Sequence, residues 1–334
     1  MCVIPAGYQP SIGIRETEIA IKDIKDYFEV DLARALNLTR VSAPLFVRSD
    51  SGLNDTLNGV ERPVAFDIKA QQGAPVEIVH SLAKWKRMAL ARYGFAHGEG
   101  LYTDMSAIRR DEDTDNIHSL YVDQWDWEVI IDRQERTEET LKRLVRQVYS
   151  ALKHTEEMVA AKYAWAVPIL PPDITFITSQ ALEDRYPALT PKEREHAIAK
   201  ACGAVFIMQI GGVLRSGQQH DGRAPDYDDW QLNGDILVYY PLLDIGLELS
   251  SMGIRVDEEA LVRQLAVRGC SERAALPFQR ALLQGQLPFT AGGGIGQSRM
   301  CMFFLNKAHI GEVQSSVWPP ETEAACARHG VQLL

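Results

Sequence analysis

The chain has few cysteines, and no pair of them has the spacing of a zinc site. Its five cysteines are scattered, odd in number and never arranged as C-x-x-C. This pattern predicts neither a disulfide framework nor a zinc centre. Cys2 is a separate case, because a cysteine exposed by removal of Met1 is the nucleophile of one class of glutamine-hydrolysing domains. The residues that follow do not support such a domain, so we expect no nucleophilic role for Cys2.

An excess of positive charge and a long apolar run are also missing. The 35 Lys and Arg residues against 45 Asp and Glu residues give a net charge of −10. A nucleic-acid-binding protein normally has a basic face, so this balance argues against nucleic acid as a partner. No apolar run approaches the roughly 20 residues that span a bilayer, and the start of the chain is too short and uncharged for a signal peptide. We expect a cytoplasmic enzyme without a membrane partner.

The most informative stretch runs from Ile108 to Glu128. It begins with two arginines, passes through an acidic loop and ends in alternating residues. As a strand, it would place Trp125, Trp127 and Val129 on one face and Gln124, Asp126 and Glu128 on the other. Buried carboxylates need partners, and arginines suit phosphate oxygens. The pattern therefore predicts a sheet floor that binds a zwitterion beside a polyphosphate. A solvated edge hairpin fits the alternation equally well.

The first long amphipathic segment covers residues 16–36. Its apolar residues recur at three- and four-residue steps, which predicts a helix. Residues 38–47 are strand-like, and Pro44 marks an edge or a bend. A helix that leads into an edge strand is typical of a dimer contact, although packing on its own core is an equally good interpretation.

Ser81 has the position of an N-cap for a helix over residues 82–93. Lys84 and Lys86 stand two residues apart in this helix, so they lie on different faces. We expect at most one of them to reach a site near the cap and the other to be solvated.

The remaining segments predict an α+β fold: a mainly antiparallel sheet flanked by helices, without strict βαβ units. Glu248, Ser250, Met252 and Ile254 should share one face of their strand. Residues 211–230 form a charged loop, either simply mobile or an active-site lid. Glycines at 292–296 let the backbone approach a ligand, and the following helix start favours anions. Further helices are expected at 139–165, 191–202, 257–268 and 300–305, and further strands at 64–68, 76–79, 174–178, 204–210, 233–241 and 248–256.

In their order, these segments resemble the three signatures of class II aminoacyl-tRNA synthetase catalytic domains. The first helix with the strand to Pro44 is similar to the first signature. Arg109, Arg110, Glu112 and the strand to Glu128 are similar to the second. Gly294-x-Gly296-x-x-Arg299 is similar to the third, whose arginine holds the distal phosphate of ATP.

Longer blocks narrow the resemblance to the ammonia-dependent asparagine synthetases, from about Arg15 to Trp318. The resemblance implies that aspartate, ATP and ammonia give asparagine, AMP and pyrophosphate through an aspartyl-adenylate. It also implies Mg²⁺, a single catalytic domain over residues 1–334 without an anticodon-binding domain, and a homodimer. The similar blocks are residues 80–87, 121–128, 223–230, 232–235 and 248–255.

The resemblance also implies roles for individual residues. Arg109 would contact the α-phosphate, Arg299 the γ-phosphate and Arg223 the nucleotide, with Gly294 and Gly296 beside it. Asp235 and Glu248 would bind Mg²⁺. Ser251 and Arg255 would line the same pocket, and Asp228 would support a closed loop. The amino acid would be surrounded by Asp55, Ser81, Lys86, Gln124 and Asp126, of which Asp55 and Lys86 join Arg109 and Arg299 as the expected catalytic residues.

Plainer interpretations of three of these residues stay open. Asp126 is compatible with a simple pair with a neighbouring arginine, and Asp228 with a solvated loop charge. Arg255 is compatible with a structural ion pair. We also expect Asp55, or a neighbouring carboxylate, to help convert ammonium to ammonia, because only the uncharged amine has a lone pair for attack.

Two positions depart from the synthetase pattern. Val122 stands where the synthetases place a phenylalanine that stacks on adenine. Arg110-x-Glu112 fits the general second signature, whereas the asparagine synthetase pattern selects Arg109, which we prefer.

Two other functions are compatible with parts of the pattern. One is an adenylate former that passes its acyl group to tRNA or a second amine; the acidic balance and the missing tRNA-binding domain argue against it. The other is a regulatory protein without turnover. That protein should have lost some of the four key residues, and all are present: Arg109, Arg299, Asp235 and Glu248.

Overall fold

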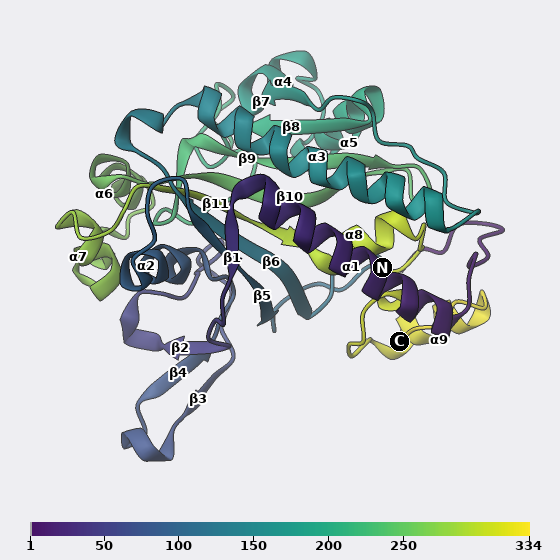
Figure 1. The fold of residues 1–334 in the computed structure, drawn as a ribbon, viewed down its shortest axis with the longest axis horizontal. Coiled ribbons are helices and arrows are strands. Elements are labelled where there is room, and N and C mark those ends of the chain that lie inside the picture. The colour runs from purple at the N-terminus through teal and green to yellow at the C-terminus, as the bar shows by residue number, and fades with distance from the viewer. Residues whose placement is uncertain (1) are drawn as a thin grey trace.

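The computed structural model describes residues 2–334, and a twisted eight-stranded sheet forms its centre (Figure 1). The outer pairs β1–β5 and β7–β8 are parallel, and every pair between them is antiparallel. The predicted α+β class with a mainly antiparallel sheet is therefore confirmed. In spatial order the strands are β1 Leu38–Arg40, β5 Gly100–Ile108, β6 Tyr121–Ile130, β11 Thr290–Gly296, β10 Ile245–Arg255, β9 Asp228–Tyr240, β8 Ala204–Met208 and β7 Thr175–Thr178.

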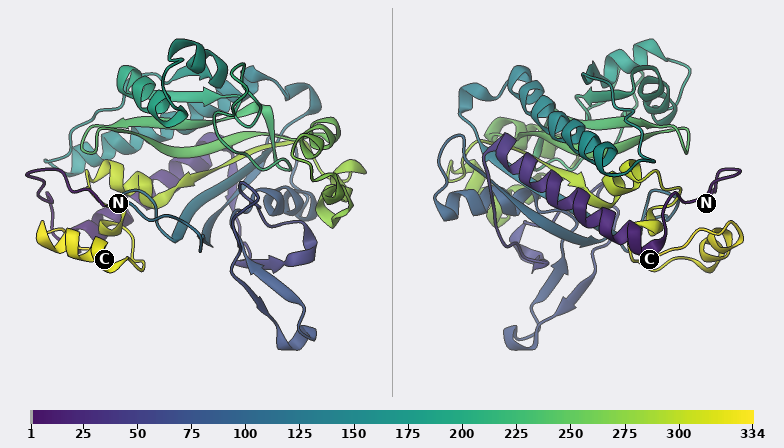
Figure 2. Two further views of the ribbon diagram at one scale, coloured as in Figure 1. Left: turned by 180° about the vertical axis from the view of Figure 1, so that it is seen from behind. Right: turned by 45° about the vertical axis from the view of Figure 1, so that its right-hand side comes forward.

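Two long helices, α1 Ile14–Leu36 and α3 Glu138–Lys162, lie side by side across one face of this sheet (Figures 1 and 2). The apolar stripe of α1 packs on the tryptophan face of β6, and α3 packs on α1 and on β9 in the same core. The ring of Phe28 lies 4.8 Å from that of Trp125, centroid to centroid. Trp127 is also fully buried in this core. The opposite face of β6, with Gln124 and Asp126, is thus left for polar chemistry.

The remaining helices pack around the sheet, and α8 lies against its central strands β6, β10 and β11. α4 and α5 pack on β8 and β9 through an apolar cluster that includes Leu182 and Ile198. α5 was predicted with its observed bounds. The helices are α2 Ala83–Tyr93, α4 Ser179–Arg185, α5 Pro191–Cys202, α6 Glu258–Val267, α7 Pro277–Leu283, α8 Gln297–Phe304 and α9 Pro320–Arg328, with 3₁₀ turns at Ser49–Ser51, Lys69–Gln71, Arg133–Glu135, Ser271–Ala275 and Ile310–Glu312.

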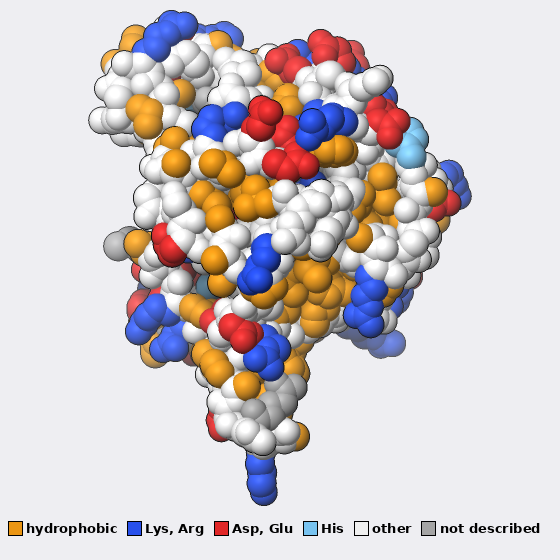
Figure 3. All heavy atoms as spheres, turned by 90° about the vertical axis from the view of Figure 1, so that its left-hand side faces the viewer, with side chains coloured by type: hydrophobic (Ala, Val, Ile, Leu, Met, Phe, Trp, Pro, Cys, Tyr) orange, Lys and Arg blue, Asp and Glu red, His pale blue; other side chains and the backbone are white. Residues whose placement is uncertain are grey.

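A second sheet of three short strands forms an arm that projects from the body (Figures 1 and 3). Its strands are β2 Phe46–Arg48, β4 Pro75–Ile78 and β3 Ala65–Asp67. The expected strand over residues 38–47 is therefore wrong as a single element. Pro44 lies in the connection between β1 and β2, which belong to different sheets. Figure 3 shows hydrophobic side chains on the body above the arm.

Three further expectations differ from the structure. β9 begins at Asp228, so Asp228 and Trp230 belong to a strand and not to the preceding loop. The glycine-rich residues form strand β11. The helix after Ser81 takes Leu82 as its N-cap residue, without a capping side chain. Among residues 2–334, the helices are all too short or too polar to cross a bilayer.

Candidate active site

A cavity of about 420 Å³ opens on the polar face of the sheet. Its floor comes from β6, β10 and β11. Its walls come from the segments around Asp55, Ser81, Arg109 and Arg223. Thirteen of the fifteen predicted site residues line it; Lys86 and Asp235 do not. The thirteen are Asp55, Ser81, Arg109, Gln124, Asp126, Arg223, Asp228, Glu248, Ser251, Arg255, Gly294, Gly296 and Arg299.

Strand register brings the three signature segments together on this floor. Asp126 of β6 lies opposite Gly294 of β11, and Gly294 in turn lies opposite Ser251 of β10. A Cβ atom at Gly294 would stand 2.5 Å from Gln124 Oε1. The glycine therefore leaves room for the Gln124 carboxamide to lie over β11. The glycines were expected to let the backbone come close to a ligand. At Gly294 the backbone instead comes close to a side chain of the protein, that of Gln124.

A bulge in β10 sets which of its side chains face the cavity. Glu248 pairs with Leu237 and Ser250 with Ile236, so the strand contains one additional residue here. Met252 and Ile254 belong to the core, whereas Glu248 lines the cavity. The prediction that these three share one face is wrong, because the bulge interrupts the two-residue alternation.

Lys86 lies on the same face of the sheet as the cavity but does not line it. Its side chain is fully buried, and Nζ donates to Asp126, to the Trp127 carbonyl (2.8 Å) and to the Gly293 carbonyl (3.1 Å). Asp126 also accepts from the backbone N–H of Leu82 at 3.1 Å. The structure thus pairs Asp126 with a lysine, where an arginine was the open alternative. Lys86 fixes the carboxylate but has no exposed atom of its own for the amino acid.

Lys84, expected to be solvated, is buried as well. Its Nζ lies 2.9 Å from Asp226, whose side chain also accepts from Gln279 at 2.7 Å. Helix α2 is covered on both sides, so its two lysines each need a buried acid. Ser81 does not cap this helix: its Oγ is 3.5 Å from the Ala83 nitrogen, at the limit of a hydrogen bond. It instead lines the cavity.

Arg255 is the centre of a buried ion-pair network. Its Nε donates to Glu128 at 3.0 Å, one Nη donates to Glu128 at 2.6 Å, and the other donates to Asp228. Burial would raise the pKa of Glu128, but the charge and hydrogen bonds of Arg255 outweigh it and lower the pKa. The structural interpretation of Arg255 is therefore correct, although Arg255 still lines the cavity. Asp228 joins this network at the start of β9, and its support of a closed loop stays a prediction.

A second charged group surrounds Arg223. Its guanidinium donates to Asp235 and, at 3.1 Å, to Asp221. Burial raises the pKa of Asp235 to about 7. The negative charges of Glu248 and Asp221 raise this pKa further, whereas the positive charge of Arg223 lowers it. Asp235 Oδ1 has no hydrogen-bond partner among the described residues. Asp235 therefore lies behind Arg223, and only Glu248 of the predicted metal-binding pair lines the cavity.

Two guanidinium groups retain donors for a ligand. Within the described part of the chain, Arg109 Nε has no partner, and its Nη1 is 3.7 Å from Glu112. Arg299 donates to the carbonyls of Ile117 (3.3 Å) and Glu248 (3.1 Å). Arg110 lines the same cavity as Arg109. The preference for Arg109 over Arg110 thus stays a prediction.

Sequence reasoning missed several cavity residues. His80 is 1% exposed, and its Nδ1 lies 3.1 Å from the Asp55 carbonyl. Its place beside Ser81, in a block already singled out, was the available signal. Lys192 and Gln314 also line the cavity. Nothing in the sequence pattern separates them from ordinary surface or core residues.

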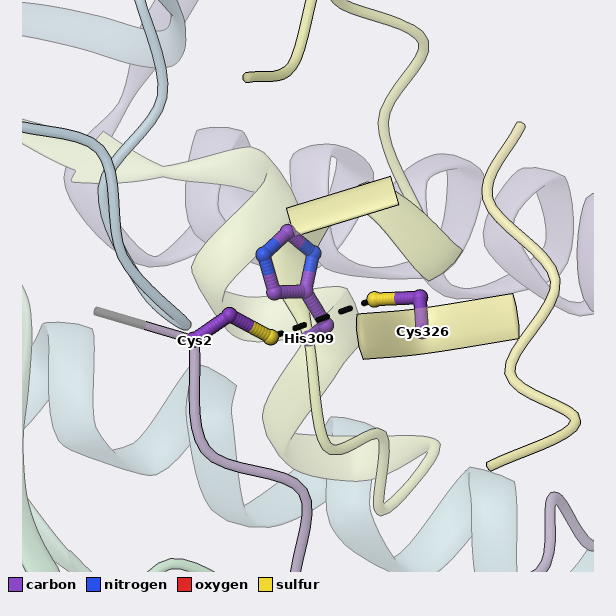
Figure 4. Close-up of side chains that lie close together, drawn as sticks. All are labelled: Cys2, His309 and Cys326. Carbon is purple, nitrogen blue, oxygen red and sulfur yellow. Dashed lines mark hydrogen bonds between the residues drawn. The ribbon is translucent and has the colours of Figure 1, made fainter. Parts of the chain in front are cut away.

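Cys2, His309 and Cys326 form a cluster of side chains that does not line the cavity (Figure 4). The Gly311 N–H donates to His309 Nδ1 at 3.0 Å, so Nε2 carries the ring proton and neither nitrogen offers a free lone pair. The two sulfurs are 3.9 Å apart. Burial raises the pKa of both thiols, that of Cys326 to about 12. Burial thus favours the neutral thiol at both cysteines, and the absence of a nucleophilic role for Cys2 stays a prediction.

The comparisons with solved structures agree with the fold. The asparaginyl-tRNA synthetase of Entamoeba histolytica, solved with asparaginyl-adenylate, is 12% identical with a TM-score of 0.64 over 90% of this chain. The Pyrococcus horikoshii asparaginyl-tRNA synthetase, also with asparaginyl-adenylate, is 15% identical with a TM-score of 0.60 over 92% of this chain. The chain spans 66% and 71% of these two synthetases. Its fold is that of the class II synthetase catalytic domain.

Sequence relatives are closer and cover nearly the whole chain. The aspartate–ammonia ligase of Clostridium perfringens is 66% identical over 99% of this chain and 98% of its own length. That of Fusobacterium nucleatum is 62% identical over 98% of this chain and all of its own length. The family model of aspartate–ammonia ligases matches residues 15–330. The chain therefore belongs to the aspartate–ammonia ligase family.

Proposed function

We propose that this protein joins ammonia to L-aspartate at the expense of ATP, giving L-asparagine, AMP and pyrophosphate. Family membership supports the reaction. The observation that carries it is the convergence of Arg109, Arg299, Asp126 and Glu248 on one cavity. That cavity combines cationic donors for a polyphosphate with carboxylates for an amino group, and both are needed to activate an amino acid.

The chemistry explains why both ligands must share one floor. A carboxylate is a poor electrophile, and transfer of AMP onto the β-carboxylate of aspartate makes a mixed anhydride that ammonia can attack. The transfer requires the carboxylate oxygen in line with the α-phosphorus, and fixed donors where charge develops. Strands β6, β10 and β11 are rigid supports for such donors.

On the aspartate side, we assign Asp126 to the α-ammonium group. Lys86 and the Leu82 N–H already hold its carboxylate in one orientation. Gln124, Ser81, Ser251 and Asp55 surround the same space. Lys86 thus serves the substrate indirectly, by preventing Asp126 from rotating away.

On the nucleotide side, we assign Arg109 to the α-phosphate and Arg299 to the distal phosphate. Arg223 lies in the wall that would cover the nucleotide. Val122 lines the cavity where the synthetases stack phenylalanine on adenine. Its smaller side chain gives less stacking area, so the cationic contacts carry a larger share of nucleotide binding. Gly294 and Gly296 leave β11 without side chains where it lines the cavity.

The acidic residues beside Arg223 fit a divalent cation. Asp235 has a buried oxygen without a partner, and its pKa is raised by burial beside two other carboxylates. Carboxylate oxygens are the ligands that Mg²⁺ prefers. We assign Glu248 and Asp235 to Mg²⁺, and Arg223 to the nucleotide. Bound there, the ion would neutralise charge on the phosphates.

Ammonia must be uncharged to attack the anhydride. Asp55 is 3% exposed and lines the cavity next to Ser81, so we propose that its carboxylate assists the conversion of ammonium to ammonia. A single-turnover measurement on Asp55→Asn tests this. We expect the adenylate to form at a normal rate and asparagine release to slow; an unchanged rate and pH profile of release would refute the role.

The overall reaction is tested by product analysis with aspartate, ATP, Mg²⁺ and ¹⁵N-ammonium. We expect ¹⁵N in the side-chain amide, with one AMP and one pyrophosphate per asparagine. Aminoacylation of tRNA without ammonium incorporation would select the competing adenylate former. Binding of aspartate or AMP without pyrophosphate release would select the regulatory protein.

We further propose a cytoplasmic homodimer built from one catalytic domain per chain. Helix α1 exposes Ile19, Tyr27 and Val30, each at least 40% exposed, beside the edge strand β1. Apolar side chains in a row on one helix suit a self-complementary contact.

A further inference from the structure

His80 has an unpaired ring nitrogen in the wall of the active-site cavity. Its Nδ1 lies 3.1 Å from the Asp55 backbone carbonyl, and a carbonyl oxygen only accepts hydrogen bonds. The ring proton therefore resides on Nδ1, and Nε2 carries a lone pair. Nε2 has no partner among the described residues, although His80 is only 1% exposed. A buried acceptor without a donor is costly unless a ligand supplies one.

The surroundings of His80 select a small cationic donor as that ligand. His80 lies between Asp55, to which its ring is bonded, and Ser81, its neighbour in the chain. Both of these residues line the part of the cavity that we assign to aspartate. The other lining imidazole, His118, bonds Asp115 through Nδ1 at 2.9 Å, and its side chain is 35% exposed, so water can reach its Nε2. Within the described lining, His80 is thus the imidazole whose acceptor nitrogen is buried without a donor.

We propose that His80 Nε2 accepts a proton from the bound ammonium ion and so generates the nucleophile. This inference rests on the proposed function. Imidazole is the side chain used most often as a general base near neutral pH. The Nδ1–H bond to Asp55 fixes both the tautomer and the ring plane, so the lone pair is aimed before the substrate arrives.

The proton balance of the step is complete without a further reactant. One N–H bond of ammonium breaks, and its proton moves to Nε2 to give an imidazolium. The nitrogen lone pair then forms the C–N bond at the β-carbonyl carbon, and the bond from that carbon to the phosphate oxygen breaks, with AMP as leaving group. A second nitrogen proton passes to solvent, and the imidazolium returns its proton to solvent after release. Asp55 would hold the cation while His80 deprotonates it.

The test uses His80→Asn, because the Asn amide nitrogen can replace Nδ1–H as donor to Asp55 while Nε2 is lost. Two nucleophiles are compared on the full-length enzyme: ammonium, and hydroxylamine, which is largely neutral at pH 7 and needs no deprotonation before attack. We expect asparagine formation to fall about 100-fold or more. Aspartyl hydroxamate formation and aspartate-dependent ATP–pyrophosphate exchange should change less than about threefold.

The outcomes separate this inference from its alternatives. Equal losses with ammonium and hydroxylamine would overturn it and assign His80 to positioning. A matching loss of exchange would assign it to adenylate formation. If the wild type shows no aspartate-dependent ATP–pyrophosphate exchange, the proposed function itself is wrong, independently of the role of His80. His80→Gln, which keeps a polar side chain but cannot take the proton, repeats the test if His80→Asn does not fold. His118→Asn is the matched control. It should change the rates of asparagine and aspartyl hydroxamate formation by the same factor.

Discussion

At the scale of single residues, the buried cations that hold the acidic side chains of the floor matter to the site as much as the residues that line it. Lys86 meets Asp126 and two backbone carbonyls, and Glu128 lies 3.8 Å away. Burial lowers the pKa of Lys86, while the charges of Asp126 and Glu128 act in the opposite direction. A buried acid whose partner is removed keeps its desolvation cost without compensation.

Lys86→Met should therefore destabilise the fold by about 3–5 kcal/mol. It should also weaken aspartate binding, because Asp126 loses its main anchor. Urea unfolding and an aspartate titration of pyrophosphate exchange measure the two effects. Lys22→Met is the control: the Lys22 side chain is 73% exposed and pairs with the exposed Asp26, so its loss should change stability by less than about 0.5 kcal/mol. Equal stability of the two variants would contradict the buried pairing.

His309 predicts a pH dependence of stability. Burial lowers its pKa from 6.5 to about 4. The unfolded chain takes up a proton below pH 6.5 and the folded chain does not, so stability is full above pH 6.5 and falls as the pH drops toward 4. The contribution is at most about 3 kcal/mol.

His309→Asn retains an acceptor for the Gly311 N–H and removes the titration. Unfolding midpoints measured from pH 7 to pH 4 should decline less steeply in this variant than in the wild type. Parallel curves for the two proteins would show that His309 is not the titrating group.

Most residues that line the cavity could be predicted from the sequence. Their hydrogen-bond and ion-pair partners could not. Alternation along β6 separates Gln124 and Asp126 from Trp125 without any tertiary knowledge. The pairing of Arg223 with Asp235, in contrast, joins a loop to a strand across a gap that no local pattern encodes. Lys84 and Lys86 read as ordinary helix lysines because their burial depends on what covers both sides of α2.

At the scale of elements, the glycines of β11 control how closely the neighbouring strands and side chains approach. A Cβ atom at Gly292 would meet Glu128 Oε2 at 2.0 Å and the Trp127 carbonyl at 2.6 Å. At Gly296 the nearest atom, in Arg299, would be 3.5 Å away. Two glycines of one strand thus differ in what they tolerate.

Gly292→Ala should cost about 1–3 kcal/mol by overpacking and should disturb the Arg255–Glu128 pair. Gly296→Ala, the matched variant, should retain the stability of the wild type. Thermal unfolding of both variants decides the comparison. Similar melting temperatures would mean that β11 relaxes more easily than its packing implies.

Elements with a strong period were predictable, and elements defined by their partners were not. The stripes of α1, α3 and α5 are local properties, so their helices were found within a few residues. The early start of β9 depends on pairing of Asp228 with Arg255. The arm strands are too short to show alternation, and the division at Pro44 depends on two different sheets.

At the scale of the whole molecule, the sheet order explains how distant segments make one cavity. Strand β6 pairs with β11, and β11 with β10, although about 160 residues separate the first two in the chain. The order of the three signatures along the chain was readable, whereas this spatial order follows only from the assembled sheet. No local pattern states which strand lies next to which.

The outer face of α1 tests the proposed homodimer. Val30→Glu should shift the mass from dimer to monomer in analytical ultracentrifugation, because it places a charge on the apolar row of this helix. Val262→Glu on α6 is a matched control, since both valines are 54% exposed. If the Val30→Glu variant stays dimeric, the dimer contact does not involve this face of α1. If Val262→Glu also abolishes the dimer, the effect is not specific to α1.

The bulge in β10 also determines where the chain tolerates a change of length. Between Glu248 and Ser251 the strand already contains one residue more than its neighbour, so loss of Ser250 would straighten it and leave both faces as they are. Loss of Met252 would instead move the next residues of β10 to the opposite face, up to the second register shift between Gly253 and Arg255. Among natural variants of this strand, gaps should therefore collect at the bulge.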